Sequence, residues 1–297
     1  MSDARRFSGV YPILYAFYDA QGGIDEAAMC LQVERCIAAG AHGIAVLGLV
    51  TEVHKLDVDE RRQIVDVVAD AIAGRVPLAV TVGEPSVPGQ VAFARHAARA
   101  GAAWVILQPP AKGYAEAEYL RFLGRVADSL DLPVAIQNNP VNMDVALSNT
   151  GLLALHRNHR NITLLKGEGP AVQVAALIEQ AGSAIDVFAG HGGKEFLSNL
   201  RSGCAGLIPA PDCLDVQLRI YELMRAGQEG EAARLHASIL PLIVFMTHSV
   251  PLLLCYGKRL IARRLGIETI HERAPELQPT AFGLAEVERM ARMLGPL

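Results

Sequence analysis

The chain contains an apolar, β-prone run that carries one lysine to its far end and then stops at glycines, Asn161-Ile162-Thr163-Leu164-Leu165-Lys166-Gly167-Glu168-Gly169. Lys166 is one of five lysines, and the other four lie in polar surroundings typical of solvated side chains. At the end of a buried strand the charged ammonium is disfavoured, and a neutral amine can attack a ketone to form a Schiff base. The alternative is an ion pair with Glu168 or Glu52, because strand-end lysines also serve as charge partners.

Apolar runs of this kind recur along the chain, with amphipathic segments between them. Successive runs lie roughly 25 to 35 residues apart, which is the spacing of repeated β-α units. Eight such units predict an α/β fold, a (β/α)8 TIM barrel of parallel strands. The expected strands are Val10–Phe17, Gly43–Leu47, Pro77–Val82, Ala103–Leu107, Pro133–Ile136, Ile162–Leu165, Ile185–Ala189 and Ala205–Ile208.

The segments between the runs have helical periodicity, and several have helical end signals. Asp25–Ala39 and Asp57–Ala73 begin with aspartate and are followed by glycine, as helices commonly are. Tyr114–Leu130, Pro170–Ala181 and Leu214–Arg225 have the same pattern. We therefore expect residues 1–226 to form the catalytic barrel.

Residues 227–297 have no strand signal and predict a helical extension packed on the barrel. We expect three helices there, Glu229–Met246, Pro251–Leu265 and Leu284–Leu294. Prolines interrupt the apolar stretch near residue 250, so we expect no membrane span.

The composition excludes several classes of protein. A net charge of −4 and a pI near 6.1 offer no basic surface for nucleic acid or an anionic membrane. Five scattered cysteines without a Cys-x-x-Cys pair favour reduced thiols over a zinc site or a disulfide framework, so no metal is expected. The Arg5-Arg6 pair is not followed by an apolar export signal, so we expect a soluble cytoplasmic protein.

In a (β/α)8 barrel the active site forms from the segments that follow the carboxyl ends of the strands. Here these segments contain glycine, amide groups, one lysine and two glutamates. They are Gly48-Leu49-Val50-Thr51-Glu52, Gln108-Pro109-Pro110, Gln137-Asn138-Asn139-Pro140, Lys166-Gly167-Glu168-Gly169, Gly190-His191-Gly192-Gly193 and Pro209-Ala210-Pro211-Asp212.

These motifs resemble the dihydrodipicolinate synthase and N-acetylneuraminate lyase family of Schiff-base-forming barrels. The likeness spans about residues 7 to 265. Gly48–Glu52 corresponds to the family's Gly-Thr-Thr-Gly-Glu motif, and Lys166 corresponds to its Schiff-base lysine. Asn138 and Pro140 match the family's motif after strand five.

The departures from the family pattern narrow the expected reaction. Gln137 stands where most members have tyrosine, and Leu49 and Val50 replace two threonines. Pro110 and Ala111 stand where tyrosines are expected, and Asn142 lies near a position where synthases have a substrate-binding arginine. Dihydrodipicolinate synthesis is therefore not expected. With a glutamine at this position, with Lys166-Gly167-Glu168-Gly169-Pro170 and with a tail that contains Pro275-Glu276-Leu277, the chain resembles the branch that contains L-2-keto-3-deoxyarabonate dehydratase.

The resemblance implies a cofactor-free lyase that dehydrates a 2-keto-3-deoxy sugar acid through a Lys166 Schiff base. Glu168 is the expected proton carrier, and Gln137, which cannot exchange protons at neutral pH, is expected to orient substrate or water. We expect substrate binding by Leu49, Val50, Thr51, Asn138, His191 and Pro209, with Glu52 ordering the strand-two turn from behind. A homotetramer is also expected, because tetramers are common in the family.

Other functions stay open at this point. Retro-aldol cleavage to pyruvate needs the C4 hydroxyl deprotonated, and the missing tyrosine counts against it. Deamination of a cyclic imino acid is a further family reaction. A catalytically silent barrel that binds a keto acid is the alternative outside enzymes.

Overall fold

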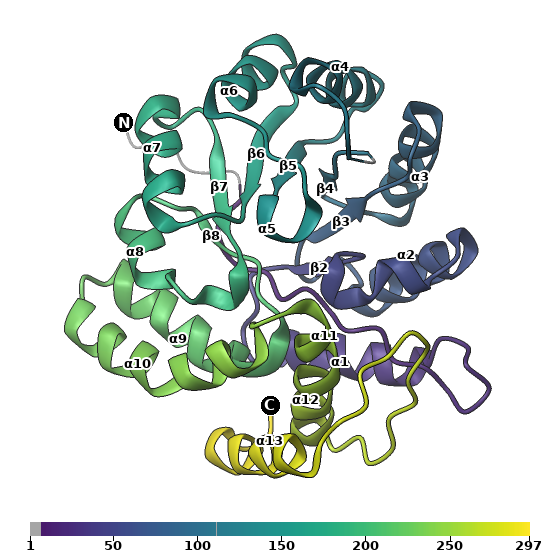
Figure 1. Cartoon of the computed structure of the whole chain (residues 1–297), viewed down its shortest axis with the longest axis vertical. Coiled ribbons are helices and arrows are strands. Elements are labelled where there is room, and N and C mark those ends of the chain that lie inside the picture. Colours follow the sequence, from purple (N-terminus) through teal and green to yellow (C-terminus); the bar gives the residue numbers. More distant parts are fainter. Residues whose placement is uncertain (1–6, 111) are drawn as a thin grey trace.

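Eight parallel strands form one sheet in the computed structural model, which describes residues 7–110 and 112–297. The strand order is β1-β8-β7-β6-β5-β4-β3-β2, so β2 to β8 pair consecutively, β1 pairs with β8, and β1 and β2 form the two edges of the sheet. Figure 1 shows the strands at the centre with helices around them. The strands are β1 Gly9–Val10, β2 Ile44–Val46, β3 Leu78–Val82, β4 Trp104–Leu107, β5 Val134–Asn138, β6 Ile162–Gly167, β7 Asp186–Ala189 and β8 Gly206–Leu207.

The prediction of a continuous strand over Val10–Phe17 is wrong, because regular pairing ends at Val10. Pro12 has no N–H group with which to continue the ladder. The following residues still contact the opposite edge of the sheet. Ile13 forms an isolated parallel bridge with Ala45, and the Leu14 N–H donates to the Ala45 carbonyl (3.0 Å).

Helices follow the strands as the periodicity predicts. The predicted helices at residues 25–39, 57–73, 170–181 and 214–225 are confirmed within one residue at each end, and that at 114–130 within three. Asp25 and Asp57 cap their helices as predicted. The helices are α1 Glu26–Ala38, α2 Val58–Ile72, α3 Val87–Ala100, α4 Glu116–Ala127, α5 Pro140–Met143, α6 Asn149–Asn158, α7 Ala171–Ala181, α8 Phe196–Arg201 and α9 Leu214–Arg225; short 3₁₀ turns are η1 Leu49–Thr51, η2 Val53–Lys55, η3 His191–Gly193 and η4 Pro211–Cys213.

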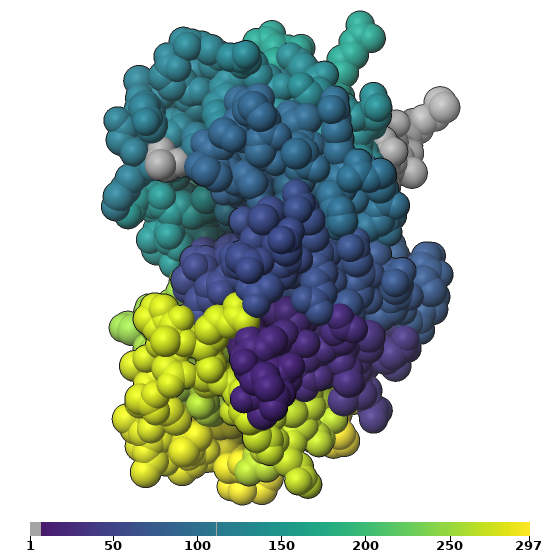
Figure 2. Space-filling view, turned by 90° about the vertical axis from the view of Figure 1, so that its right-hand side faces the viewer, coloured from purple at the N-terminus to yellow at the C-terminus, as the bar shows by residue number. Residues whose placement is uncertain are grey.

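The C-terminal residues are helical as predicted and pack against the N-terminal part of the chain. Figure 2 shows the C-terminal segment (yellow) beside the N-terminal segment (purple), where Tyr18 bridges His271 and Arg273 pairs with Glu60 (2.7 Å). The elements are α10 Glu229–Met246, α11 Val250–Leu252, the π-helical turn η5 Leu253–Gly257, α12 Lys258–Leu265 and α13 Ala281–Leu294.

Two further expectations concern the thiols and the membrane. None of the five cysteines, all of which the structure describes, forms a disulfide bond. Within residues 7–110 and 112–297, no single helix is long and apolar enough to cross a membrane. Only α10 taken together with Val250–Leu265 meets that length and composition, and a bend of 107° separates the two.

An aromatic cluster fills part of the interior of the sheet. The Trp104 ring lies 5.7 Å from the Tyr11 ring and 5.5 Å from the Phe188 ring, measured between centroids. All three side chains are buried. Polar side chains gather instead where the strands end, around Lys166 on β6.

Candidate active site

Lys166 and Glu168 lie together at the end of β6. Lys166 is 4% exposed and pairs in register with Gln137 of β5 and Phe188 of β7. Pairing extends past Lys166, because the Glu168 N–H donates to the Asn138 carbonyl (2.9 Å). Side chains two residues apart therefore share a face, and Lys166 Nζ lies 3.5 Å from Glu168 Oε2.

A row of buried amide groups holds Glu168. Gln137 donates from Nε2 to Glu168 Oε2 (2.5 Å) and accepts at Oε1 from Gln108 Nε2 (2.9 Å). Gln90 in turn donates to the Gln108 carbonyl (2.9 Å). The Gln108 amide therefore orients that of Gln137, which presents its N–H₂ group to the carboxylate, while Gln90 binds the main chain of Gln108. No sequence pattern predicts this role for Gln108, although it is the first residue of the segment after strand four.

Two glycines leave room for this row. A methyl group on Gly190 would lie 2.4 Å from Glu168 Cγ, and one on Gly83 would lie 2.5 Å from Gln108 Oε1. Both distances are far shorter than van der Waals contact, so a side chain at either position would displace the amide row or the carboxylate.

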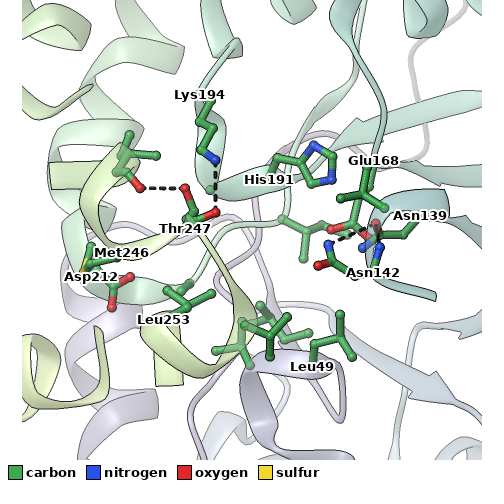
Figure 3. A pocket seen from close by; sticks show the side chains of 18 of the residues that line it. Leu49, Asn139, Asn142, Glu168, His191, Lys194, Asp212, Met246, Thr247 and Leu253 are labelled. Carbon is green, nitrogen blue, oxygen red and sulfur yellow. Dashed lines mark hydrogen bonds between the residues drawn. The ribbon is translucent and has the colours of Figure 1, made fainter. Parts of the chain in front are cut away.

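These groups border a cavity of about 380 Å³ at the ends of the strands. Figure 3 shows His191, Glu168, Asn139 and Asn142 on one side of it. Leu49, Val50 and Lys166 also line it, as do Lys194, Asp212, Thr247 and Ser249. No tyrosine is among the described residues of its wall. Ala111, which stands at an expected tyrosine position, lies outside the described residues.

The strand-two turn borders the cavity with its backbone. Leu49 and Val50 begin the short η1 turn, where the first N–H groups of a helix lack partners within it. Thr51 does not line the cavity, contrary to expectation. Its hydroxyl donates to the Leu14 carbonyl (2.7 Å) and accepts from the Leu47 N–H (2.9 Å), so it fixes the turn instead.

Glu52 lies behind this turn in a buried cluster of charges. It has a left-handed backbone conformation (φ 57°), and its carboxylate contacts Lys55 (2.5 Å) and Lys258. Lys258 also pairs with Glu272 (3.3 Å). The prediction of a solvated Lys258 is wrong, because its side chain is 0% exposed. Its burial depends on carboxylates 206 and 14 residues away in sequence.

Two other predicted substrate contacts are not in the cavity wall. Both ends of the Asn138 amide bond the Leu147 backbone, at 3.0 Å each. Asn138 points away because Gln137 on the same strand points inward. The Pro209 carbonyl accepts a hydrogen bond from the Ile13 N–H (2.7 Å), so the backbone of Pro209 continues the hydrogen bonding beyond β8. Asn139, which was not predicted, lines the cavity in place of Asn138.

His191 lines the cavity as predicted, in a strained backbone conformation (φ 52°). Burial, the largest effect, lowers the pKa of its imidazole; Glu168 opposes this, and Lys194 and Lys166 add to it. The ring is therefore neutral at physiological pH.

Asp212 is another ionisable group in the wall, and sequence reasoning did not single it out. Burial raises its pKa to about 7, although a hydrogen bond from Tyr15 (3.2 Å) and the charge of Arg264 oppose the rise. A carboxyl with this pKa exchanges protons near neutral pH.

Known proteins share this architecture. A model of the dihydrodipicolinate synthetase family matches residues 6–275. The chain is 28% identical to the L-2-keto-3-deoxyarabonate dehydratase of Azospirillum brasilense, over 100% of this chain and 97% of that protein. It is 26% identical to a putative 2-dehydro-3-deoxy-D-gluconate aldolase of Escherichia coli, over 79% and 78%. A crystal structure of a putative dihydrodipicolinate synthetase from Pseudomonas aeruginosa superposes with a TM-score of 0.90, at 25% identity, over 97% and 99%.

Proposed function

Because the chain belongs to the dihydrodipicolinate synthetase family, we propose that it is a lyase that dehydrates a 2-keto-3-deoxy sugar acid through a Schiff base on Lys166. The family resemblance expected from the sequence is confirmed. The Azospirillum relative's name supports 2-keto-3-deoxyarabonate as the first substrate to test. The Escherichia coli relative is a putative aldolase, so the choice between dehydration and aldol cleavage is argued from the residues of the site and not from the relatives.

One observation carries the proposal. Lys166 Nζ lies 3.5 Å from the Glu168 carboxylate, which is held by Gln137 at a position where most of the family has a tyrosine. An amide cannot exchange protons at neutral pH, so Glu168 is the acid and base beside the amine. Elimination needs one such group next to C3. Aldol cleavage needs the C4 hydroxyl to lose its proton, and the tyrosine expected to relay that proton is absent from the described cavity wall.

The proposed reaction starts with the substrate's carboxylate on the backbone N–H groups of Leu49 and Val50. The Lys166 amine adds to the C2 ketone and releases water, which gives a protonated imine. The positive nitrogen acidifies the C3 hydrogens, and Glu168 removes one to give an enamine. The enamine expels the C4 hydroxyl, and the proton held by Glu168 converts it to water. The conjugated imine that remains loses a proton from C5 and gains one at C3, and the resulting C4–C5 enol becomes an aldehyde by moving its hydroxyl proton to C4. Hydrolysis of the imine then frees Lys166 and releases 2,5-dioxopentanoate.

The reaction needs no cofactor, because the imine nitrogen itself accepts the electron pair. Closure of the sheet into a (β/α)8 barrel is supported by the Ile13–Ala45 bridge. Residues 1–226 as barrel and 227–297 as extension, a cytoplasmic location and a homotetramer stay predictions.

Product analysis with purified protein tests the reaction. With 2-keto-3-deoxyarabonate, dehydration yields 2,5-dioxopentanoate, whereas retro-aldol cleavage yields pyruvate. With a hydroxypyrroline carboxylate, deamination releases ammonia. Pyruvate as the main product would replace the proposal by an aldolase, and no product with any of these acids would favour a silent binding protein.

A further inference from the structure

Four buried polar atoms in the cavity wall have no hydrogen-bond partner in the described protein: Nδ2 of Asn139, Nε2 of His191, Oδ1 of Asp212 and Oε1 of Gln217. Of these residues, Asn139 and His191 lie on the side of the cavity where Glu168 lies (Figure 3). Asn139 is only 1% exposed. Buried polar atoms are nearly always hydrogen-bonded, and leaving one without a partner is costly. Two such atoms on one side of the cavity indicate a polar group of a ligand.

The fold does not require the Asn139 amide nitrogen. Oδ1 of Asn139 caps the short α5 helix by accepting the Asn142 N–H (3.2 Å) and is also bonded by the Asn142 side chain (3.1 Å). Serine or aspartate would cap this helix as well as asparagine does. The N–H₂ group of Asn139 therefore has no role in capping this helix.

His191 is likewise held at some cost to the fold. Its φ of 52° lies in the left-handed region, which side chains other than glycine, asparagine and aspartate rarely adopt. The turn that holds it runs from Gly190 to Gly193. Strained backbone of this kind is often found at ligand sites.

Both residues are neighbours of Glu168. Asn139 follows Asn138, whose carbonyl accepts the Glu168 N–H, and His191 follows Gly190, against which the Glu168 side chain packs. Figure 3 shows His191, Glu168 and Asn139 on the same side of the cavity. If C2 of the substrate is bonded to Lys166 and C3 faces Glu168, the C4 hydroxyl is the next substrate group that can reach Asn139 and His191.

We propose that Asn139 and His191 form a recognition site for the C4 hydroxyl of a 2-keto acid. The amide of Asn139 donates to the hydroxyl oxygen. Nε2 of His191, in the tautomer with its proton on Nδ1, accepts the hydroxyl hydrogen. A hydroxyl both donates and accepts, so it complements one donor and one acceptor. This inference rests on the proposed Schiff base and adds the group that separates sugar acids from plain keto acids.

The test compares two ligands that differ only by the C4 hydroxyl, 2-oxopentanoate and 4-hydroxy-2-oxopentanoate. Each is titrated against the full chain with borohydride, and the reduced adduct is quantified by mass spectrometry. The ratio of the two half-saturating concentrations measures selection for the hydroxylated acid. Asn139→Ser keeps the helix cap and removes the amide donor, and His191→Asn suits the left-handed backbone without reaching the Nε2 position. His191→Gln is the conservative variant that restores a polar group near Nε2.

We expect the wild type to prefer the hydroxylated acid, and each of Asn139→Ser and His191→Asn to reduce that preference by roughly tenfold or more. His191→Gln should recover part of it. A wild type without preference, or variants that weaken both ligands equally, would overturn the recognition site while leaving the Schiff base intact. Failure of the wild type to form an adduct with either acid would reject the proposed function and this inference with it.

Discussion

Replacing Gln137 tests how Glu168 is held. Gln137→Leu has a similar size but removes the donor to Glu168 Oε2 and the acceptor for Gln108 Nε2. Both neighbours are buried. A buried polar group without its partner costs about 1 to 3 kcal/mol, so the free energy of unfolding should fall by about 2 to 6 kcal/mol. Urea denaturation followed by circular dichroism measures this.

The same variant should also slow turnover. A carboxylate that is no longer fixed spends less time near C3, and kcat should fall by about 100-fold. Adduct formation with pyruvate should persist, because Lys166 is unchanged. Gln137→Glu is the matched control, because a protonated carboxyl can still donate to Glu168. Its activity should be highest at low pH and fall as pH rises, when two adjacent carboxylates repel. Unchanged kcat in Gln137→Leu would refute the role given to the amide row.

Three further changes test separate parts of the molecule. Glu168→Gln should still form the borohydride-trapped adduct but lose turnover, and full activity in rate assays would leave Glu168 a purely structural role. Asp212, with its pKa raised from 3.8 to about 7, favours the folded state below pH 4 and loses that contribution as pH rises through 7. The wild type should therefore lose up to roughly 4 kcal/mol of unfolding free energy between pH 4 and pH 8 that Asp212→Asn does not lose, as urea titrations at the two pH values would measure. A difference between variant and wild type that is the same at pH 4 and pH 8 would contradict this. Lys258→Met leaves the buried Glu52 with one cation fewer and should lower the free energy of unfolding by about 3 to 5 kcal/mol. The control Lys112→Met removes an exposed ion pair and should leave the urea midpoint unchanged.

The parallel strands and the Lys166–Glu168 pair could be predicted from the sequence because both depend on local patterns. Apolar runs and helix caps act over a few residues, and period-two alternation brings Glu168 to the face of Lys166. Gln137 could be predicted in the same way, since it directly follows the apolar run of β5, where a barrel's site residues lie.

The rest of the site depends on contacts that sequence patterns do not record. The burial of Lys258 requires Glu52, which is 206 residues away in sequence. Asn139 lines the cavity and Asn138 does not. Asn138 is the last residue of β5, and Asn139 is the cap that joins it to α5. The pKa of Asp212 is raised by burial, and its contacts with Tyr15 and Arg264 join residues 197 and 52 positions apart, so no local motif indicates it.

The most direct measurement is borohydride trapping of pyruvate on the wild type and on Lys166→Ala, with the modified peptide identified by mass spectrometry. The Schiff-base account predicts one reduced adduct per chain, located on Lys166, and none on Lys166→Ala. Lys194, which also lines the cavity, provides an internal comparison. No adduct on the wild type, or an adduct on Lys194 that survives in Lys166→Ala, would contradict the account.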